Sequence, residues 1–367
     1  MITMARRRFY VKRGALYGNK GAAPAVPFLF RDEFITDDAA PMTSPHTCEP
    51  GPGSATILDT TNKLSISGGV LSCLDGVERD NKYKSATTFD RSAGLALYAD
   101  VVGVWPLAQL GWRVVDDDSW YFTLGVWTWY GSLNASHGSG WSNFSIGGDG
   151  KVGRWFVILR DGAGAYYVRK TSDVYYLMYV SKINTAASGL TIIAGANGGA
   201  STFDNVSVKQ AASPWTSDSG LQSFYDASAS AGDTGTQQAD GIVEATWVAV
   251  TGETYELSFR MTDVDNRWIV RIDQAGSTVK IIERNAGAET ERSTAAVTFT
   301  NGTSYRVQAY LNDEFVFITT ASFLEGSYWS AAFNKTATGM KTSHAATDFT
   351  AWGRTLSEAA IAALDAL

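Results

Sequence analysis

Short segments in which apolar and polar residues alternate recur along nearly the whole chain, and they constrain the fold more than any other feature. Residues 63–67 alternate and end at the pair Gly68-Gly69, and residues 94–101, 119–127 and 153–160 continue the series. A period of two places alternate side chains on opposite faces of a β-strand. Glycine pairs permit the positive φ angles of tight turns. Many short strands without helical intervals are typical of a sandwich or barrel.

The strand-like segments form two series, and a chain of 367 residues is long enough for two hydrophobic cores. The stretch between them is polar and rich in small residues, which is typical of a linker. We therefore predict an all-β protein of two antiparallel β-sandwich domains. The predicted parts are an extended basic arm at 1–27, a first sandwich at 28–210, a linker at 211–219 and a second sandwich at 220–367.

One helix is predicted, at the end of the chain. Ser357 suits an N-cap, and Glu358 places a negative charge in the first turn, where the helix dipole favours it. The apolar stripe of this helix consists of Leu356, Ile361, Leu364 and Leu367. Because the helix is short, it must dock on a larger element, and we expect that element to be the second sandwich.

The charge of the chain is divided unevenly. The net charge is −7, yet residues 1–20 contain six basic side chains and no acidic one, namely Arg6, Arg7, Arg8, Lys12, Arg13 and Lys20. The remainder has 24 basic residues against 37 acidic ones. We expect the arm to dock on a negative surface or in a protein groove. Nucleic acid is not an expected partner of the acidic body, which would repel phosphates.

The sequence also bears on location. No apolar stretch reaches the roughly 18 residues of a membrane-spanning helix. No apolar segment follows the N-terminal arginines, so we do not expect a secretory signal peptide. Such a chain is either processed beforehand or released by lysis, as virion proteins are. The two cysteines, Cys48 and Cys73, either pair or remain free thiols.

Two motifs resemble a known superfamily. Residues 262–273, TDVDNRWIVRID, resemble the strand-turn-strand of concanavalin A-like and laminin G-like jelly-roll modules. Residues 349–364, FTAWGRTLSEAAIAAL, are similar to the ending of that superfamily, although Ala360 stands where an acidic residue is more common. The first domain is similar in style through Phe30-x-Asp32-x-Phe34 and residues 204–208. The resemblance implies jelly-roll-like sandwiches, of a kind found in tailed-phage virion proteins, adhesins and sugar-binding appendages.

Tryptophan is concentrated in the first domain, where seven of the twelve residues lie between Trp105 and Trp155. Most of these rings are expected to fill the core, because each buries a large area. An exposed indole can instead stack on the C–H face of a sugar. The rings that flank a Gly/Ser/Asn loop are the candidates for carbohydrate binding, namely Trp127, Trp129, Tyr130 and Trp141.

Two acidic clusters are calcium candidates, because calcium prefers several oxygen ligands from loops. One is Asp116-Asp117-Asp118, and the other is Asp263, Asp265 and Asn266. A solvated turn is the alternative for both, since Asp and Asn favour tight turns. No cofactor is predicted otherwise.

Catalysis finds little support in the sequence. The histidines His46, His137 and His344 lack neighbouring Cys or carboxylate residues at metal-ligand spacing, and His46 with Cys48 reads as a coincidence. The paired-carboxylate pattern of concanavalin-like glycosidases is absent, and residues 287–292 read as a hairpin tip. We therefore predict that the chain is not an enzyme.

The sequence favours a structural or accessory protein of a tailed-phage virion, on its head or tail and multimeric in the assembly. Arg6, Arg7, Arg8, Lys12 and Arg13 would anchor it to other virion proteins. The displayed sandwiches could also adhere to host-surface glycans. The alternatives are a carbohydrate-binding module at the cell surface or outside the cell, and a concanavalin-like polysaccharide-active enzyme.

Overall fold

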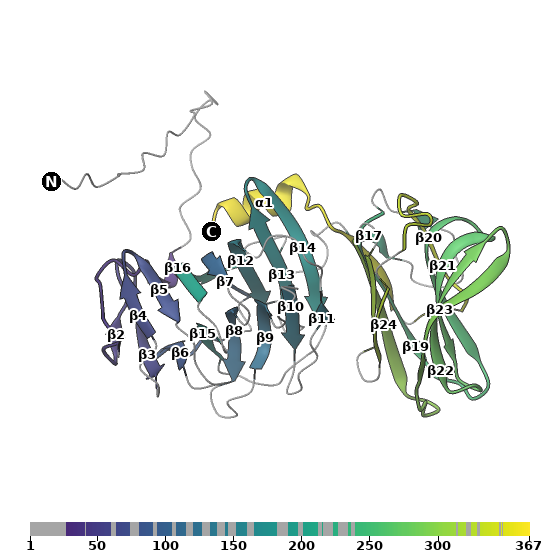
Figure 1. Cartoon of the computed structure of the whole chain (residues 1–367), viewed down its shortest axis with the longest axis horizontal. Coiled ribbons are helices and arrows are strands. Elements are labelled where there is room, and N and C mark those ends of the chain that lie inside the picture. Colours follow the sequence, from purple (N-terminus) through teal and green to yellow (C-terminus); the bar gives the residue numbers. More distant parts are fainter. Residues whose placement is uncertain are drawn as a thin grey trace, which may run out of the picture.

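The computed structural model describes residues 27–367 except for gaps within that range. The gaps are residues 41, 60–63, 74–80, 91–93, 105–107, 115–119, 127–132, 138–143, 146–151, 160–164, 182–189, 197–200, 212–214, 216–222, 227–233, 236–238, 313–314, 321–323, 329–330, 345 and 347. The described chain folds into two β-sandwiches that lie side by side, with one short helix (Figure 1). The all-β prediction is confirmed.

The first sandwich consists of two eight-stranded antiparallel sheets. Sheet A has the order β14 (Val174–Ser181), β13 (Ala165–Thr171), β12 (Gly153–Leu159), β7 (Leu95–Val104), β16 (Ser201–Gln210), β5 (Val70–Cys73) and β4 (Leu64–Ser67), and β1 (Phe28–Asp32) also pairs with β16. Sheet B has the order β11 (Phe144–Ser145), β10 (Leu133–His137), β9 (Trp120–Val126), β8 (Ala108–Val114), β15 (Leu190–Ala196), β6 (Asn81–Ser85), β3 (Ser54–Asp59) and β2 (His46–Thr47).

The second sandwich consists of two six-stranded sheets. Sheet C has the order β17 (Ser223–Asp226), β28 (Asp348–Gly353), β19 (Gly241–Val248), β24 (Ser304–Asn312), β25 (Phe315–Thr320) and β26 (Leu324–Tyr328). Sheet D has the order β18 (Thr234–Gly235), β27 (Gly339–Thr342), β20 (Thr254–Asp263), β21 (Asn266–Asp273), β22 (Thr278–Asn285) and β23 (Ala288–Ala296). Every strand pairing in both sheets is antiparallel.

The local patterns were sound predictors of these strands. The alternating segments at 119–127 and 153–160 form β9 and β12. Gly68 and Gly69 have φ angles of 61° and 82°, as a tight turn between β4 and β5 requires. In β4 the alternation is visible as burial, since Leu64 and Ile66 are buried while Ser67 is exposed.

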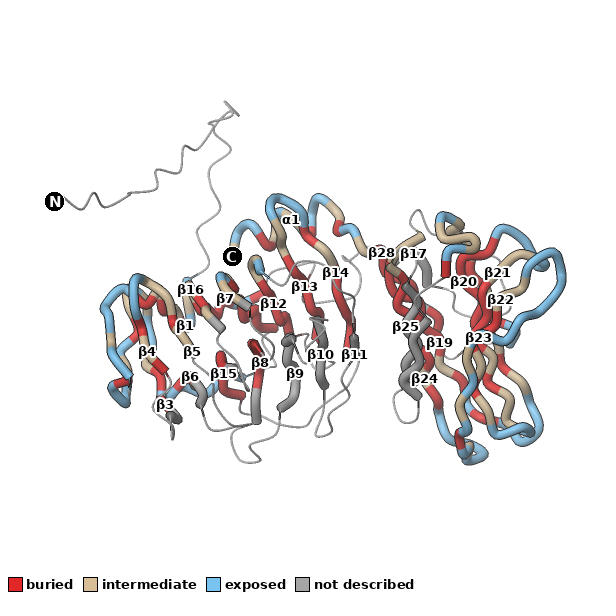
Figure 2. The backbone as a smooth tube through the Cα atoms, viewed as in Figure 1, coloured by how far each residue is buried: buried red, intermediate tan, exposed pale blue. Residues whose placement is uncertain are grey.

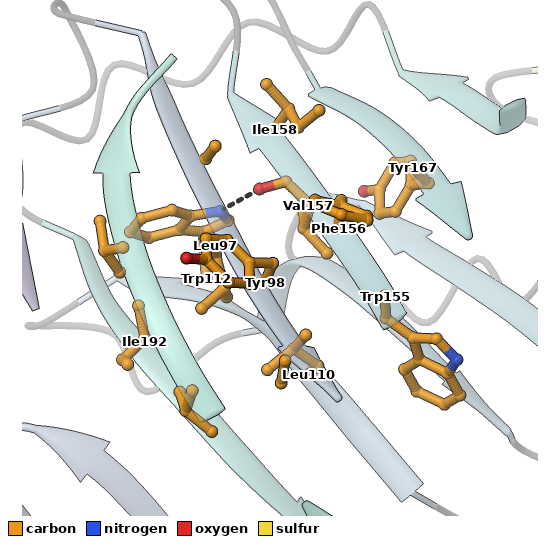
Figure 3. Packing of buried hydrophobic residues seen from close by; sticks show 14 of the residues in the cluster. Leu97, Tyr98, Leu110, Trp112, Trp155, Phe156, Val157, Ile158, Tyr167 and Ile192 are labelled. Carbon is orange, nitrogen blue, oxygen red and sulfur yellow. Dashed lines mark hydrogen bonds between the residues drawn. The ribbon is translucent and has the colours of Figure 1, made fainter. Parts of the chain in front are cut away.

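Aromatic side chains fill the core of the first sandwich. Trp112 of sheet B donates a hydrogen bond from its indole nitrogen to the carbonyl of Val157 in sheet A, at 3.0 Å, and so ties the two sheets together (Figure 3). The tryptophans whose side chains the structure describes are all buried, namely Trp112, Trp155, Trp215, Trp247, Trp268 and Trp352. The expectation that most tryptophans are core residues therefore holds for this part of the chain.

The helix α1 (Glu358–Asp365) begins as predicted, with Ser357 as its N-cap accepting a hydrogen bond from the Ala360 amide. Its docking site differs from the expected one. Ala360 and Leu364 pack in the core of the first sandwich, and the Trp215 indole donates to the Ala360 carbonyl at 3.1 Å. The prediction that the helix docks on the second sandwich is wrong (Figure 1).

This docking explains why sheet A is buried on both faces. All five residues from Trp155 to Leu159 in β12 are fully buried (Figure 2). One face of sheet A packs against sheet B, and the outward face lies under α1, where Tyr175 donates to the Asp365 carboxylate at 2.6 Å. Trp215, within the predicted linker, packs against Tyr166 at 5.6 Å between ring centroids.

The two sandwiches share a packed interface. Ile242, Tyr310 and Trp352 belong to sheet C, yet they cluster with the core of the first sandwich. Beside them, the Val180 carbonyl in β14 accepts a hydrogen bond from the Gln308 side chain at 3.1 Å. Because the helix returns to the first sandwich after β28, the second sandwich is an insertion in the first.

Candidate functional site

All of the predicted sugar-binding and anchoring residues lie outside the described residues. This applies to Trp127, Trp129, Tyr130 and Trp141, to the arm residues Arg6, Arg7, Arg8, Lys12 and Arg13, and to Asp116, Asp117 and Asp118. These assignments stay predictions. In sequence, Trp127, Trp129 and Tyr130 fall between β9 and β10, and Trp141 falls between β10 and β11.

The calcium candidate in the second sandwich is a tight turn between β20 and β21. The Asp263 carboxylate accepts hydrogen bonds from the Asp265 amide at 2.8 Å and from the Asn266 side chain at 2.9 Å. These bonds, chiefly the one from Asn266, lower the pKa of Asp263. Asp265 in turn pairs with Arg284 at 3.1 Å. Among the described residues, no three His, Cys, Asp or Glu side chains are grouped to hold a metal ion.

A buried polar cluster, which we call the Asp32 cluster, joins Asp32, His46, Cys48 and Tyr83. Asp32 is fully buried, and its carboxylate accepts a hydrogen bond from the Tyr83 hydroxyl at 2.5 Å and lies 2.9 Å from Nε2 of His46. Sequence spacing does not reveal this grouping, because Tyr83 is 51 residues from Asp32. His46 therefore has a carboxylate neighbour in space that its position in the sequence does not indicate. His344 also has a carboxylate neighbour, Glu253, at 3.4 Å.

The electrostatics of the Asp32 cluster favour structure over nucleophilic chemistry. Burial raises the pKa of Cys48 to about 12, and burial also raises the pKa of Tyr83. A thiol with such a pKa remains protonated near neutral pH, whereas reactive cysteines have depressed pKa values. Cys48 is a free thiol 3.4 Å from the Tyr83 hydroxyl. Cys48 is therefore unpaired in the structure, which agrees with the second of the two alternatives, free thiols.

A second polar cluster lies on the outward face of sheet A, and we call it the outer patch. Arg154 donates to both carboxylate oxygens of Asp100, from Nε and from a terminal nitrogen, each at 2.7 Å. The Asn205 side chain donates to the same carboxylate at 3.3 Å. The guanidinium also stacks over the Tyr98 ring at 5.3 Å. The hydrogen bond to Asp100 raises the pKa of Arg154, which keeps the guanidinium charged.

The backbone register places these groups on one face. Arg154 pairs with Asp100 across β12 and β7, so both side chains project from the same side of the sheet. Val102 and Val152 are each two residues away along these chain segments, and they are 55% and 47% exposed. Asn205 has a φ of 54° at an irregularity in the pairing of β16 with β7. The outer patch therefore combines fixed polar groups with exposed apolar surface.

Comparison with known proteins adds little information about this chain. No protein-family model and no curated protein matches this chain. Among solved structures, a segment is similar to the carbohydrate-binding module CBM66 from Bacillus subtilis, which is 14% identical, with 35% of this chain and 78% of that chain covered and a TM-score of 0.27. Galectin LEC-6 from Caenorhabditis elegans is 9% identical, with coverage of 35% and 91% and a TM-score of 0.29.

An uncharacterized protein from Mycobacterium paratuberculosis is 14% identical, with 49% of this chain and all of that chain covered, and it has a TM-score of 0.33. All three TM-scores are below 0.5. The helix in the described part of the chain is too short to cross a membrane.

Proposed function

We propose that this chain is a non-catalytic carbohydrate-binding protein and that the outer patch of the first sandwich forms part of its sugar site. The observation that carries the proposal is the bidentate pair of Arg154 and Asp100, whose side chains are 34% and 31% exposed although both are held rigidly. Sugar hydroxyls are both donors and acceptors. Polar side chains fixed in advance bind them at a smaller cost in conformational entropy.

The surroundings of this pair also suit a sugar. Val102 and Val152 offer apolar contacts to the C–H groups of a pyranose ring, and Asn205 presents an amide beside the carboxylate. A small number of well-placed polar groups among apolar contacts is what small-ligand sites generally contain. The aromatic residues Trp127, Trp129, Tyr130 and Trp141 remain candidates for stacking on the same or another glycan.

A glycan array with the full chain tests the proposal, followed by titration of any glycan that binds. Arg154→Met is expected to weaken binding about tenfold or more, because it removes charge-assisted hydrogen bonds. Arg292→Met is the matched control, since Arg292 forms an exposed pair with Glu283 in sheet D. An array without signal for the wild-type chain rejects the proposal. Release of reducing sugars from a bound polysaccharide would instead support the enzyme alternative.

We also propose a location for this binding protein, namely a tailed-phage virion to which the basic arm anchors it. Six basic and no acidic residues in 1–20, on an otherwise acidic chain, support the proposal. The first strand starts at Phe28, so deletion of residues 1–26 leaves every described strand in place. The deletion is expected to abolish incorporation into particles. Unchanged incorporation of the shortened chain would contradict anchoring by the arm.

A further inference from the structure

The polar side chains of the outer patch belong to a longer row that crosses sheet A from β16 to β14, strands that are labelled in Figure 1. Asp204 pairs with Asp100 across β16 and β7, and Asp100 pairs with Arg154 across β7 and β12. Arg154 pairs with Lys170 across β12 and β13, and Lys170 pairs with Tyr175 across β13 and β14. Directly opposite residues of an antiparallel pair share one face of the sheet, so these side chains form one row.

Most of this row is open to solvent. The side chains of Asp100, Arg154 and Lys170 are 31%, 34% and 28% exposed, and Asp204 is half-buried. Tyr175 is buried and closes the row at its far end. Neighbouring strands lie about 4.8 Å apart, so the accessible positions on β16, β7, β12 and β13 span about 14 Å. That length exceeds a single pyranose ring.

The far end of the row is held as firmly as the Arg154 pair. The Lys170 ammonium lies 4.5 Å above the centre of the Tyr175 ring and donates to the Tyr175 hydroxyl at 3.0 Å. It also donates to the Asp365 carboxylate of α1 at 3.2 Å. A lysine ammonium has three N–H donors, and these bonds use two of them. Lys170 therefore retains one donor for a ligand.

The other positions retain hydrogen-bonding groups as well. A guanidinium has five N–H donors, of which Arg154 uses two on Asp100. The Asp100 carboxylate accepts these two and a third from Asn205, out of about four that its oxygens can accept. Burial, and after it the charge of Asp100, raise the pKa of Asp204, which indicates that no cation pairs closely with that carboxylate. The row thus offers acceptors on β16 and β7 and donors on β12 and β13.

The charges along the row nearly cancel. Arg154 and Lys170 are the cations, and the carboxylates of Asp204, Asp100 and Asp365 stand beside them. A row of mixed charges gives a polyanion no net attraction. A neutral chain of hydroxyl groups can use both the free donors and the free acceptors.

We propose that the outer patch binds a neutral oligosaccharide of several sugar units, which lies across the strands of sheet A along this row. The inference rests on the proposed sugar-binding function and names the class of ligand. Sugar hydroxyls accept hydrogen bonds from Arg154 and Lys170 and donate to Asp100 and Asp204. A single sugar reaches only part of the row. Affinity therefore rises with chain length until the row is filled, because each added contact contributes to the free energy of binding.

The experiment is a calorimetric titration of the full chain with malto-, cello-, xylo- and manno-oligosaccharides, from the monosaccharide to the hexasaccharide. Oligomannuronates of the same lengths provide the acidic counterpart. We expect at least one neutral series to bind, with affinity that rises about tenfold from the disaccharide to the tetrasaccharide. The oligomannuronates are expected to bind more weakly than the neutral chains of equal length.

Two variants separate the centre of the row from its far end. Arg154→Met is expected to weaken the disaccharide and the hexasaccharide alike, whereas Lys170→Met should weaken the hexasaccharide about fivefold and leave the disaccharide unchanged. Lys280→Met is the matched control, because Lys280 is 31% exposed and pairs with Glu291 in sheet D, and its affinities should equal those of the wild type. Thermal unfolding verifies that each variant is folded.

The outcomes distinguish this inference from the proposed function. Binding that is independent of chain length, or an unchanged affinity of Lys170→Met for the hexasaccharide, would overturn the inference and leave a smaller sugar site intact. Preference for the oligomannuronates would overturn the neutral ligand. Absence of binding by every saccharide in the series would reject the inference together with the proposed function.

Discussion

The hydroxyl of Tyr83 donates a 2.5 Å hydrogen bond to the carboxylate of Asp32, and both side chains are fully buried. The Tyr83 ring also meets Phe30 and Phe34 edge to face, at 6.2 and 5.4 Å. All three named positions of the motif Phe30-x-Asp32-x-Phe34 therefore converge on one tyrosine of β6. The motif joins β1 of sheet A to sheet B.

Tyr83→Phe is expected to lower the free energy of unfolding by about 1.5–3 kcal/mol, the range for a hydrogen bond to a charged group. The variant keeps the ring and removes the hydroxyl, which donates to Asp32 and contacts the Cys48 thiol. Denaturant unfolding measures the change. Tyr176→Phe keeps the ring over which Arg354 stacks and serves as control, with an expected change within about 0.5 kcal/mol. Equal unfolding midpoints for Tyr83→Phe and the control would show that the bond does not stabilise the fold.

His46 gives the first sandwich a pH dependence of known sign. Its pKa is raised above 6.5, chiefly by the hydrogen bond to Asp32, and the charges of Asp32, Asp38 and Glu49 contribute. A raised folded-state pKa means that the stabilisation is complete below pH 6.5 and is lost as the pH rises through the folded value. We expect the free energy of unfolding of the wild type to fall over this interval relative to His46→Gln. Parallel curves for the two proteins would contradict the assignment.

Leu364→Ala tests the docking of α1. Leu364 is 2% exposed and packs with the core of the first sandwich, so its truncation is expected to cost about 2–5 kcal/mol. Hydrogen exchange should quicken in β12 and β13 and stay unchanged in β21 and β22. Leu257→Ala, in the core of the second sandwich, should give the opposite pattern. Faster exchange in β21 alone after Leu364→Ala would contradict the docking of α1 on the first sandwich.

Glu244→Gln tests the interface between the sandwiches. Glu244 is fully buried and accepts a hydrogen bond from Nε of Arg306 at 2.8 Å, while Arg306 and Gln308 both donate to the Val180 carbonyl. Glu244→Gln removes the carboxylate charge from this ion pair, whose arginine side chain is 14% exposed, and we expect a cost of about 3–5 kcal/mol. We expect calorimetry to resolve two unfolding transitions in the variant and one in the wild type. A single transition in both would contradict this coupling.

Calcium is not expected to stabilise the turn at Asp263. Its carboxylate already accepts hydrogen bonds from within the turn, and the guanidinium of Arg284, 3.1 Å from Asp265, would repel a divalent cation. The melting temperature should be the same in about 5 mM calcium as in the presence of a chelator. This calcium concentration exceeds the dissociation constants of weak extracellular sites, which are about 0.1–1 mM. A calcium-dependent rise that Asp263→Ala abolishes would restore the calcium site.

The sequence predicts the strands well, because alternation is a local property, but it leaves the packing partners open. The stripe on α1 shows that the helix docks and does not show where. A signal was present in β12, where Trp155 to Leu159 is a continuous apolar run. Such a run indicates a strand covered on both faces, so it pointed to a third layer over sheet A.

The sequence also indicates, less strongly, that Asp32 belongs to a buried polar cluster. Asp32 alternates with Phe30 and Phe34, so it projects toward the core, and a buried carboxylate requires donors. The identity of those donors depends on pairing between distant strands, which a single sequence does not reveal. The outer patch depends likewise on the register of β7 against β12 and on the irregularity at Asn205.

The return of α1 to the first sandwich makes the second sandwich a replaceable cassette. The chain leaves the first sandwich near Trp215 and re-enters it near Ala360, and these two residues are joined by a 3.1 Å hydrogen bond. A short connection between them could take the place of the inserted unit, provided that the part of the host core covered by Ile242, Tyr310 and Trp352 is made polar. Both ends of the inserted unit are held at a single site, so a cargo grafted there would be presented with a fixed orientation.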